Sequence, residues 1–325
     1  MAALITLTEA SDFLKDNDGY AILTHRRPDG DTLGSAAGLC LGLRSIGKTA
    51  YVAVNPESAG RFEHFVHDLH PPEGFVPANA VSVDTAAKDL LPAAFGAMAE
   101  RVRLSIDHHP NGGLFAEETL LAPECAATGE LVVLLLNEMG VELTADIARP
   151  LYVAIVSDTG CLRYENTTSR TLRVTADLKD TGIDAAIINM EYFEKKTFSR
   201  LALEAALFSD VEILIEGRVA VMRLTLEKIR QAQATLDDTD NISALAREIT
   251  GVDVGITLRQ ERDGTTKVSL RTGSAYNAGK ICARLGGGGH ARAAGCTVKC
   301  GVEEARDIVL NAVFDEYQLA GWHLH

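Results

Sequence analysis

Four segments in the first half of the sequence place ionisable side chains directly after apolar runs. They carry His25, Asp29 and Asp31; Asp84; Asp107, His108 and His109; and Asp158. Carboxylates combined with one or two histidines suit Mn²⁺ or Mg²⁺ better than a structural zinc ion. Two such ions, about 3.5–4 Å apart, would let a convergent cluster activate water for in-line attack on phosphorus. The residue types therefore predict a site for two divalent metal ions.

Each segment taken alone also has a plain structural explanation. Asp31 could cap a helix, with His25 incidental. A strand often ends in Asp for the sake of its turn, as Asp84 could. The run Asp107-His108-His109 is harder to explain in this way, because three adjacent polar groups at a strand end need partners. The combination of the four segments favours the metal site.

Apolar runs alternate with helical patterns along the segments that carry these residues. The expected strands are Tyr20–His25, Thr49–Val54, Ala80–Asp84 and Val102–Asp107, and the expected helices are Asp31–Ile46, Thr128–Met139, Thr144–Ser157 and Thr168–Asp180. This alternation predicts an α/β fold with an open parallel sheet and helices on both faces. The carboxyl ends of parallel strands share one edge of the sheet, where active sites form. The fold would thus bring the four segments together.

The pattern changes in the second half of the chain. Asn189–Phe208 has the character of one long helix, followed by two strand-like pairs. The pairs are Val211–Ile215 with Val219–Leu224, and Val252–Arg259 with Thr266–Arg271. We therefore expect a catalytic domain over residues 1–186, a linker helix over 187–209 and a smaller mixed α/β domain over 210–325.

Composition narrows the classes of function. The chain has 325 residues and a net charge of −14, which disfavours binding to long nucleic acids or to anionic lipid. Its apolar runs are shorter than the roughly 20 residues of a membrane span, and its first 20 residues are acidic rather than signal-like. Six scattered cysteines fit a reduced, cytoplasmic protein better than a disulfide framework.

A run of four glycines, Gly286 to Gly289, precedes His290 in the second half. Such a run can expose backbone N–H groups that cradle an anion, although it can also serve as a flexible hinge. A hinge would not need the histidine that follows. The neighbouring basic residues Arg271, Lys280, Arg284 and Arg292 would form a local positive patch on an acidic protein. Together these features favour a short, highly charged ligand.

The ordered motifs resemble those of the DHH phosphoesterase superfamily, and the glycine run resembles a loop of its associated nucleic-acid-binding domain. The resemblance implies one metal ion held by His25, Asp29 and Asp84, and a second held by Asp31, Asp84, His108 and Asp158, with Asp84 bridging. It further implies that Asp107 orients the ligands. His109 would contact the substrate phosphate or protonate the leaving oxygen. The implied substrate contacts are Arg271, Gly286, Gly287, Gly288, Gly289 and His290.

Within this superfamily, the chain length and the glycine run resemble the group that degrades short oligonucleotides and dephosphorylates 3′-phosphoadenosine 5′-phosphate. The resemblance implies hydrolysis of these substrates and of linear dinucleotides, with Mn²⁺ preferred and Mg²⁺ as the alternative. A cyclic dinucleotide phosphodiesterase, a RecJ-like exonuclease and a non-catalytic nucleotide-binding protein are the other hypotheses. Both a monomer and a homodimer are compatible with the sequence.

Overall fold

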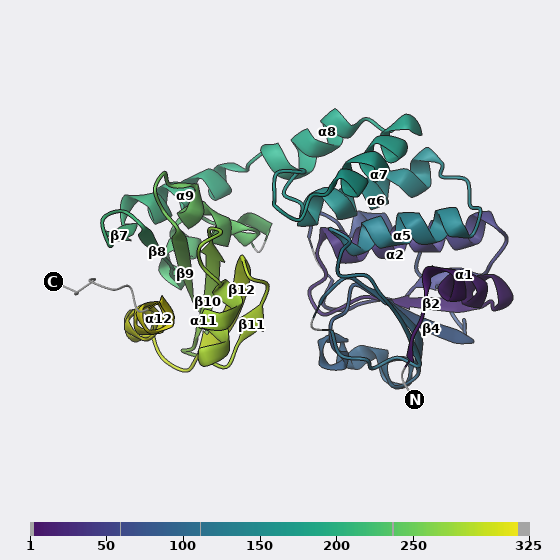
Figure 1. Ribbon diagram of the computed structural model, residues 1–325, viewed down its shortest axis with the longest axis horizontal. Helices are drawn as coiled ribbons and strands as arrows, with labels where there is room; N and C mark the ends of the chain where they lie inside the picture. The colour runs from purple at the N-terminus through teal and green to yellow at the C-terminus, as the bar shows by residue number, and fades with distance from the viewer. Residues whose placement is uncertain (1–2, 59, 111, 236, 318–325) are drawn as a thin grey trace. The chain divides into compact units, whose positions relative to one another are not determined.

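The computed structural model describes residues 3–58, 60–110, 112–235 and 237–317 (Figure 1). The chain forms two compact units, Met1–Lys195 and Lys196–His325. Each unit has its own sheet and its own apolar core. In the described part of the chain, no helix is both long enough and apolar enough to cross a membrane.

The first unit is built on a six-stranded sheet in which all paired strands run parallel. The strand order is β1-β6-β5-β4-β2-β3, with β1 Ala3–Leu4, β2 Tyr20–Leu23, β3 Ala50–Val52, β4 Asn79–Val83, β5 Val102–Asp107 and β6 Glu118–Leu121. The helices are α1 Leu7–Asp16, α2 Gly30–Ser45, α3 His64–His67, α4 Ala97–Glu100, α5 Thr128–Glu138, α6 Ala145–Asp158, α7 Ser169–Asp180 and α8 Ala185–Asn189. The predicted parallel α/β sheet is confirmed, although the short strands β1 and β6 were not predicted.

The two faces of this sheet are covered differently. Tyr20 and Ile22 of β2 point into the large core that includes residues of α2, α5 and α6. Their neighbours Ala21 and Leu23 point to the opposite face, as expected for a strand with a period of two. That second face is covered by Leu91, by Phe95 of the short helical turn Ala93–Phe95, and by partly buried residues of α4. Because both faces are covered, the strands are apolar on both sides.

Glycines at every fourth position of α2 let this helix pack very closely on its neighbours. They are Gly30, Gly34, Gly38 and Gly42, and a Cβ atom at any of them would overlap a neighbouring residue. At Gly34 it would lie 2.9 Å from the Cβ of Ala154 on α6. Residues four apart share one face of a helix, so the stripe fixes how α2 lies against α5 and α6. This close packing places the first turn of α2 beside the last turn of α6.

The second unit contains a mixed six-stranded sheet in the order β11-β12-β10-β9-β8-β7. Its elements are α9 Phe198–Ser209, β7 Glu212–Leu214, β8 Val219–Leu224, α10 Leu226–Gln231, β9 Val254–Gln260, β10 Thr266–Thr272, α11 Ala278–Arg284, β11 Gly288–Gly289, β12 Ala293–Val298 and α12 Val302–Tyr317. The β8–β9 pair is parallel and the other pairs are antiparallel. One face of the sheet packs on α11 and α12, and the other packs on α9.

The prediction of a single helix over Asn189–Phe208 is wrong. Helix α8 ends at Asn189, a π-helical turn follows over Met190–Glu194, and α9 begins only at Phe198. Thr197 causes the second start, because its side chain accepts a hydrogen bond from the backbone N–H of Arg200. The boundary between the two compact units falls in this break, after Lys195.

Candidate metal centre

The predicted metal ligands lie at the carboxyl edge of the first sheet and at the ends of two helices. His25 follows β2, Asp84 follows β4, and His108 follows β5. Asp31 lies in the first turn of α2, and Asp158 is the last residue of α6. The neighbouring strands β2, β4 and β5 therefore deliver these groups to one point, as expected for an open parallel sheet.

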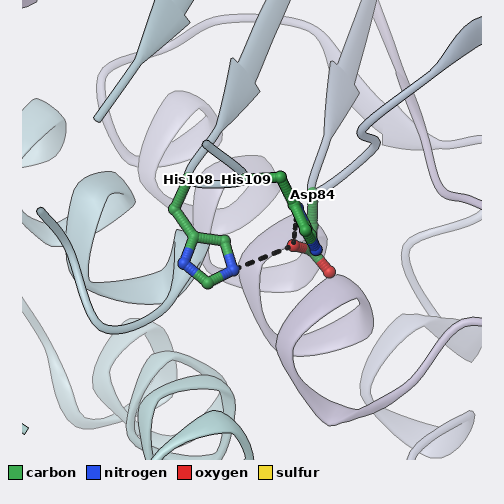
Figure 2. A group of neighbouring side chains, drawn as sticks. All are labelled: Asp84, His108 and His109. Atoms are coloured by element: carbon green, nitrogen blue, oxygen red, sulfur yellow. Dashed lines mark ion pairs between the residues drawn. The ribbon is translucent and has the colours of Figure 1, made fainter. Parts of the chain in front are cut away.

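Asp84 is at the centre of the cluster. Its Oδ1 atom lies 3.8 Å from Nε2 of His108 and 3.7 Å from Nδ1 of His109, the two contacts drawn in Figure 2. Its Oδ2 atom lies 3.7 Å from Nε2 of His25. The two oxygens of one buried carboxylate thus face histidines from two different segments. A carboxylate shared between two metal-ion sites requires this placement.

Three triplets of possible ligand atoms overlap around this carboxylate. They are His25, Asp29 and Asp84; Asp31, His108 and Asp158; and Asp84, His108 and His109, with the atoms of each triplet within 4.8 Å of one another. The first two triplets fall within the two predicted ligand sets. The third contains His109, for which a catalytic role was predicted rather than a metal-binding one. The structure brings all of these side chains to one place.

His108 shows that the cluster suits a metal ion. Its Nδ1 atom lies 3.2 Å from the carbonyl oxygen of Cys125, to which it can only donate. In the neutral ring, the form that binds a metal ion, Nε2 is then the lone-pair atom, and it is buried without a hydrogen-bond partner. It lies 3.4 Å from Asp158 and 3.8 Å from Asp31. A divalent cation would satisfy this nitrogen and the carboxylates around it.

Two threonines that the sequence analysis missed hold the carboxylates in place. Thr32 Oγ1 lies 2.7 Å from Oδ2 of Asp84 and 2.5 Å from Nε2 of His25. Thr128 Oγ1 donates to Oδ1 of Asp84 at 3.0 Å. A threonine is not a typical ligand, so a search for ligand residue types passes over it. Every buried carboxylate needs hydrogen-bond donors, and threonines close in sequence to the expected ligands or at a predicted helix start could have been considered for that reason.

Asp29 and Asp31 have different roles at the start of α2. Asp29 caps the helix, accepting from the backbone N–H of Thr32 at 3.1 Å. Asp31 lies inside the first turn and is 1% exposed, so the alternative in which Asp31 is the cap is wrong. Its oxygens accept from Ser35 Oγ and from the backbone N–H groups of Thr128 and Gly129.

Asp107 orients the two histidines that follow it. Its Oδ1 atom accepts from the backbone N–H of His108 at 2.9 Å and lies 2.8 Å from Nδ1 of His109. The hydrogen bond to the ring fixes Nδ1 as the protonated nitrogen of His109 when the ring is neutral. Asp107 itself is buried. This geometry matches the orienting role that the resemblance implied.

Strong electrostatic coupling accompanies this crowding. Burial lowers the pKa of His108, but Asp158, Asp31 and Asp84 outweigh it and raise the value to about 10. Burial and the charges of Asp84 and Asp158 hold the pKa of Asp31 well above its usual range. Burial also raises the pKa of Asp84, yet His25 and His108 lower it further, and its net shift is downward. Opposed shifts of this kind within one cluster are typical of functional sites.

The backbone at Asp84 is in the left-handed region, with a φ of 52°. For a residue other than glycine this conformation costs on the order of 1 kcal/mol, and it persists where the surrounding structure enforces it. The backbone N–H of Asp84 still donates to the carbonyl of Ile106, so the sheet continues to this point. The turn then carries the Asp84 carboxylate into the cluster.

Comparison with known proteins identifies the family. A model of the N-terminal domain of the DHH family matches residues 20–155, and a model of the DHHA1 domain matches residues 216–318. Over 305 residues the chain is 33% identical to the bifunctional oligoribonuclease and PAP phosphatase NrnA of Thermus thermophilus, covering 93% of this chain and 91% of the relative. The chain belongs to the DHH family of phosphoesterases.

Two further relatives support the family and its fold. The bifunctional oligoribonuclease and PAP phosphatase NrnA of Bacillus subtilis is 25% identical over 289 residues, covering 86% of this chain and 90% of the relative. An exopolyphosphatase-related protein from Bacteroides fragilis has a crystal structure that covers 96% of each chain with a TM-score of 0.81. Because the identity is only 23%, that structure supports the fold and nothing about function.

The glycine run of this DHH-family chain is more ordered than a free loop. Gly286 and Gly287 donate their N–H groups to carbonyls of Ala283 and Cys282 at the end of α11. Gly288 and Gly289 form β11, the edge strand paired with β12. The N–H of His290 donates to the carbonyl of Ala293. The N–H groups of Gly286, Gly287 and His290 are therefore engaged within the protein.

The basic residues near this run are partly engaged within the protein. Arg284 forms an ion pair with Glu316 at 2.5 Å. Arg292 donates to the carbonyls of Gly273 and Tyr276, which ties the run to the segment after β10. Arg271 is half-buried on β10. The side chain of Lys280 lies on α11, where the backbone N–H of Lys280 donates to Asn277.

Proposed function

We propose that this protein is a metal-dependent phosphoesterase that hydrolyses short oligoribonucleotides, linear dinucleotides and 3′-phosphoadenosine 5′-phosphate. The observation that carries the proposal is the position of Asp84, which belongs to two of the three overlapping triplets of ligand atoms and lies beside the unbonded Nε2 of His108. The Thermus and Bacillus relatives, each aligned over most of its length, are named for oligoribonucleotides and for 3′-phosphoadenosine 5′-phosphate (PAP). We add linear dinucleotides as the shortest oligonucleotides. The acidic net charge of −14 favours short substrates over long nucleic acids.

Six residues would hold two divalent ions. We assign one ion to His25, Asp29 and Asp84 and the other to Asp31, Asp84, His108 and Asp158. When bound, such ions activate water for attack on phosphorus and offset the negative charge that develops there. The mixture of carboxylate oxygens with only two imidazoles favours Mn²⁺, with Mg²⁺ as the alternative.

The remaining polar residues act on the substrate or on the ligands. We assign His109 to the leaving oxygen, to which its ring would deliver a proton. The 2.8 Å contact between Asp107 and Nδ1 of His109 fixes the ring orientation and stabilises its protonated form. We assign Arg271 and the residues Gly286 to His290 to a phosphate of the substrate. A Cβ atom at Gly286 or Gly288 would meet no atom within 4 Å, and the N–H of Gly286 is already donated to Ala283, so Gly288 is the better suited of the two to a close approach.

The test is hydrolysis by the full chain with and without metal. Phosphate release from 3′-phosphoadenosine 5′-phosphate and cleavage of a diribonucleotide are measured with Mn²⁺, with Mg²⁺ and with excess chelator. We expect both activities with Mn²⁺, their loss in chelator, and a much slower reaction on a thirty-nucleotide RNA. Equal rates on the short and long RNAs would point to a processive exonuclease instead. Full activity in chelator would exclude the two-metal mechanism.

A further inference from the structure

A single turn of the first unit touches ligands of both proposed ions. It comprises Cys125 to Gly129, at the start of α5. The N–H groups of Thr128 and Gly129 donate to the two oxygens of Asp31 at 2.7 and 2.8 Å. Thr128 Oγ1 donates to Asp84. The carbonyl of Cys125 accepts from His108. Any displacement of this turn would move three ligands at once.

Glu130, whose carboxylate lies outside the cluster of candidate metal ligands, holds this turn in place. Glu130 is fully buried, with an exposed fraction of 0%. Its Oε2 atom accepts from the backbone N–H of Ala126 and from Thr171 Oγ1, both at 2.9 Å. Its Oε1 atom accepts from Nε of Arg170 at 2.6 Å. Both oxygens of this buried carboxylate are therefore satisfied, and one of them bonds the turn directly.

Arg170 joins the same turn by a second route. While its Nε bonds Glu130, its Nη2 donates to the carbonyl of Glu124 at 2.8 Å and contacts Sγ of Cys125 at 3.2 Å. Arg170 lies in the first turn of α7, so the pair links the turn to a separate helix. On the other side the turn has no room to move, because a Cβ at Gly129 would overlap Ala154 of α6.

We propose that Glu130 and Arg170 are positioning residues that set the affinity of the centre for its divalent ions. The inference rests on the proposed function, since it concerns the same site. An ion pair with a fully buried carboxylate is a poor source of stability by itself, because the loss of hydration offsets most of the attraction. Its value here is geometric: it fixes the donors and the acceptor that orient Asp31, Asp84 and His108. Loss of such supporting contacts typically weakens metal binding by about 10- to 100-fold.

The experiment measures Mn²⁺ binding without substrate, by calorimetric titration of the full-length wild type, Glu130→Gln and Arg170→Gln. Glu130→Gln keeps the shape of the side chain but leaves a single acceptor oxygen, which cannot serve both Arg170 and the backbone N–H of Ala126. Arg170, with 36% of its side chain exposed, can be replaced without opening the core. The matched control is Glu212→Gln, which removes a carboxylate bonded to Arg223 and Arg306 in the second unit. Circular dichroism and melting in chelator verify that each variant is folded.

We expect both test variants to bind Mn²⁺ about 10- to 100-fold more weakly, while Glu212→Gln binds like the wild type. The electron paramagnetic resonance signal of two neighbouring Mn²⁺ ions should weaken in the test variants, and kcat should fall more than KM rises. Unchanged Mn²⁺ affinity in the folded Glu130→Gln or Arg170→Gln protein overturns the positioning role. Failure of the wild type to bind Mn²⁺ would instead overturn the proposed function, so the two failures are distinguishable.

Discussion

The metal-ligand cluster of the first unit and the glycine run of the second both stand out in the sequence, yet the fold uses them differently. Asp84 and His108 are buried, and hydrogen bonds from other elements fix their orientation. Gly286 to His290 lie near the edge of a sheet, and Gly288 and His290 are exposed. Buried ionisable groups are costly unless a partner compensates them, so the first region points strongly to a ligand. The glycines carry no such cost.

Packing alone accounts for part of the glycine run. A Cβ at Gly287 would lie 2.8 Å from the Cα of Cys296 and overlap the carbonyl of Gly295. Gly289 has a φ of 137°, which side-chain-bearing residues rarely adopt. These two positions need glycine to build the β11–β12 pair. A glycine motif can thus reflect the fold as much as the ligand, whereas a buried cluster of carboxylates and histidines has no such explanation.

The largest effect is expected from Asp84→Asn. Asparagine tolerates the left-handed backbone at this position and keeps one oxygen for Thr32 or Thr128, so the fold should survive. The charge shared between the two ion sites is lost. We expect turnover in Mn²⁺ to fall below about a tenth of the wild-type rate, since neither ligand set can replace it.

The matched control for this variant is Asp177→Asn, the same substitution at an exposed position of α7. Steady-state hydrolysis and a melting curve are recorded for both variants. Asp177→Asn should behave like the wild type. If the folded Asp84→Asn enzyme retained more than about a tenth of the wild-type rate, Asp84 would not be the carboxylate shared by two ions, and the first region would not differ from the second in this way.

A smaller effect should separate packing from binding within the glycine run. Gly287→Ala forces overlap with β12, and overpacking of this kind costs about 1–3 kcal/mol. Gly288→Ala meets no atom within 4 Å and should leave the stability of the second unit unchanged. Hydrogen exchange of peptides from β10 and β12, followed in both variants, measures this difference.

The same pair of variants also tests the ligand role. If a substrate phosphate approaches the backbone of this run, Gly288→Ala should raise KM for 3′-phosphoadenosine 5′-phosphate without loss of stability. Wild-type KM in Gly288→Ala would indicate that the run serves the sheet rather than the substrate. In that case the contrast between the two regions would become sharper.

Strand ends and residue types were enough to predict the parallel sheet and to name side chains that the structure brings to one place. Thr32, Thr128 and Glu130 could not be selected in this way, because their importance lies in contacts between residues far apart in the sequence, such as the bond from Thr128 to Asp31, 97 positions away. The break after Glu194 was missed because periodicity alone does not show that Thr197 starts a new helix. The glycine run was ambiguous, since a free loop and an edge strand both accept glycine.

The smallest predicted effect concerns Glu212, a charged group of the second unit remote in sequence from the metal ligands. Arg306 and Arg223 lower the pKa of Glu212 to about 2, although partial burial opposes them. Because the folded pKa lies below the unfolded value near 4.5, the carboxylate contributes stability above that pH. This contribution is lost as the pH falls from about 4.5 towards 2.

Glu212→Gln should therefore lower the stability of the second unit at pH 7 by about 1 kcal/mol, a modest amount for a partly exposed ion pair. The difference from the wild type should shrink as the pH falls below about 4.5, because the wild-type carboxylate becomes protonated there. Hydrogen exchange of peptides from β8 and α12, measured at several pH values, reports on this unit separately from the first. A difference that stays constant down to pH 3 would show that the substitution acts through packing rather than charge. Of the two regions, only the cluster of candidate metal ligands would then depend mainly on charge.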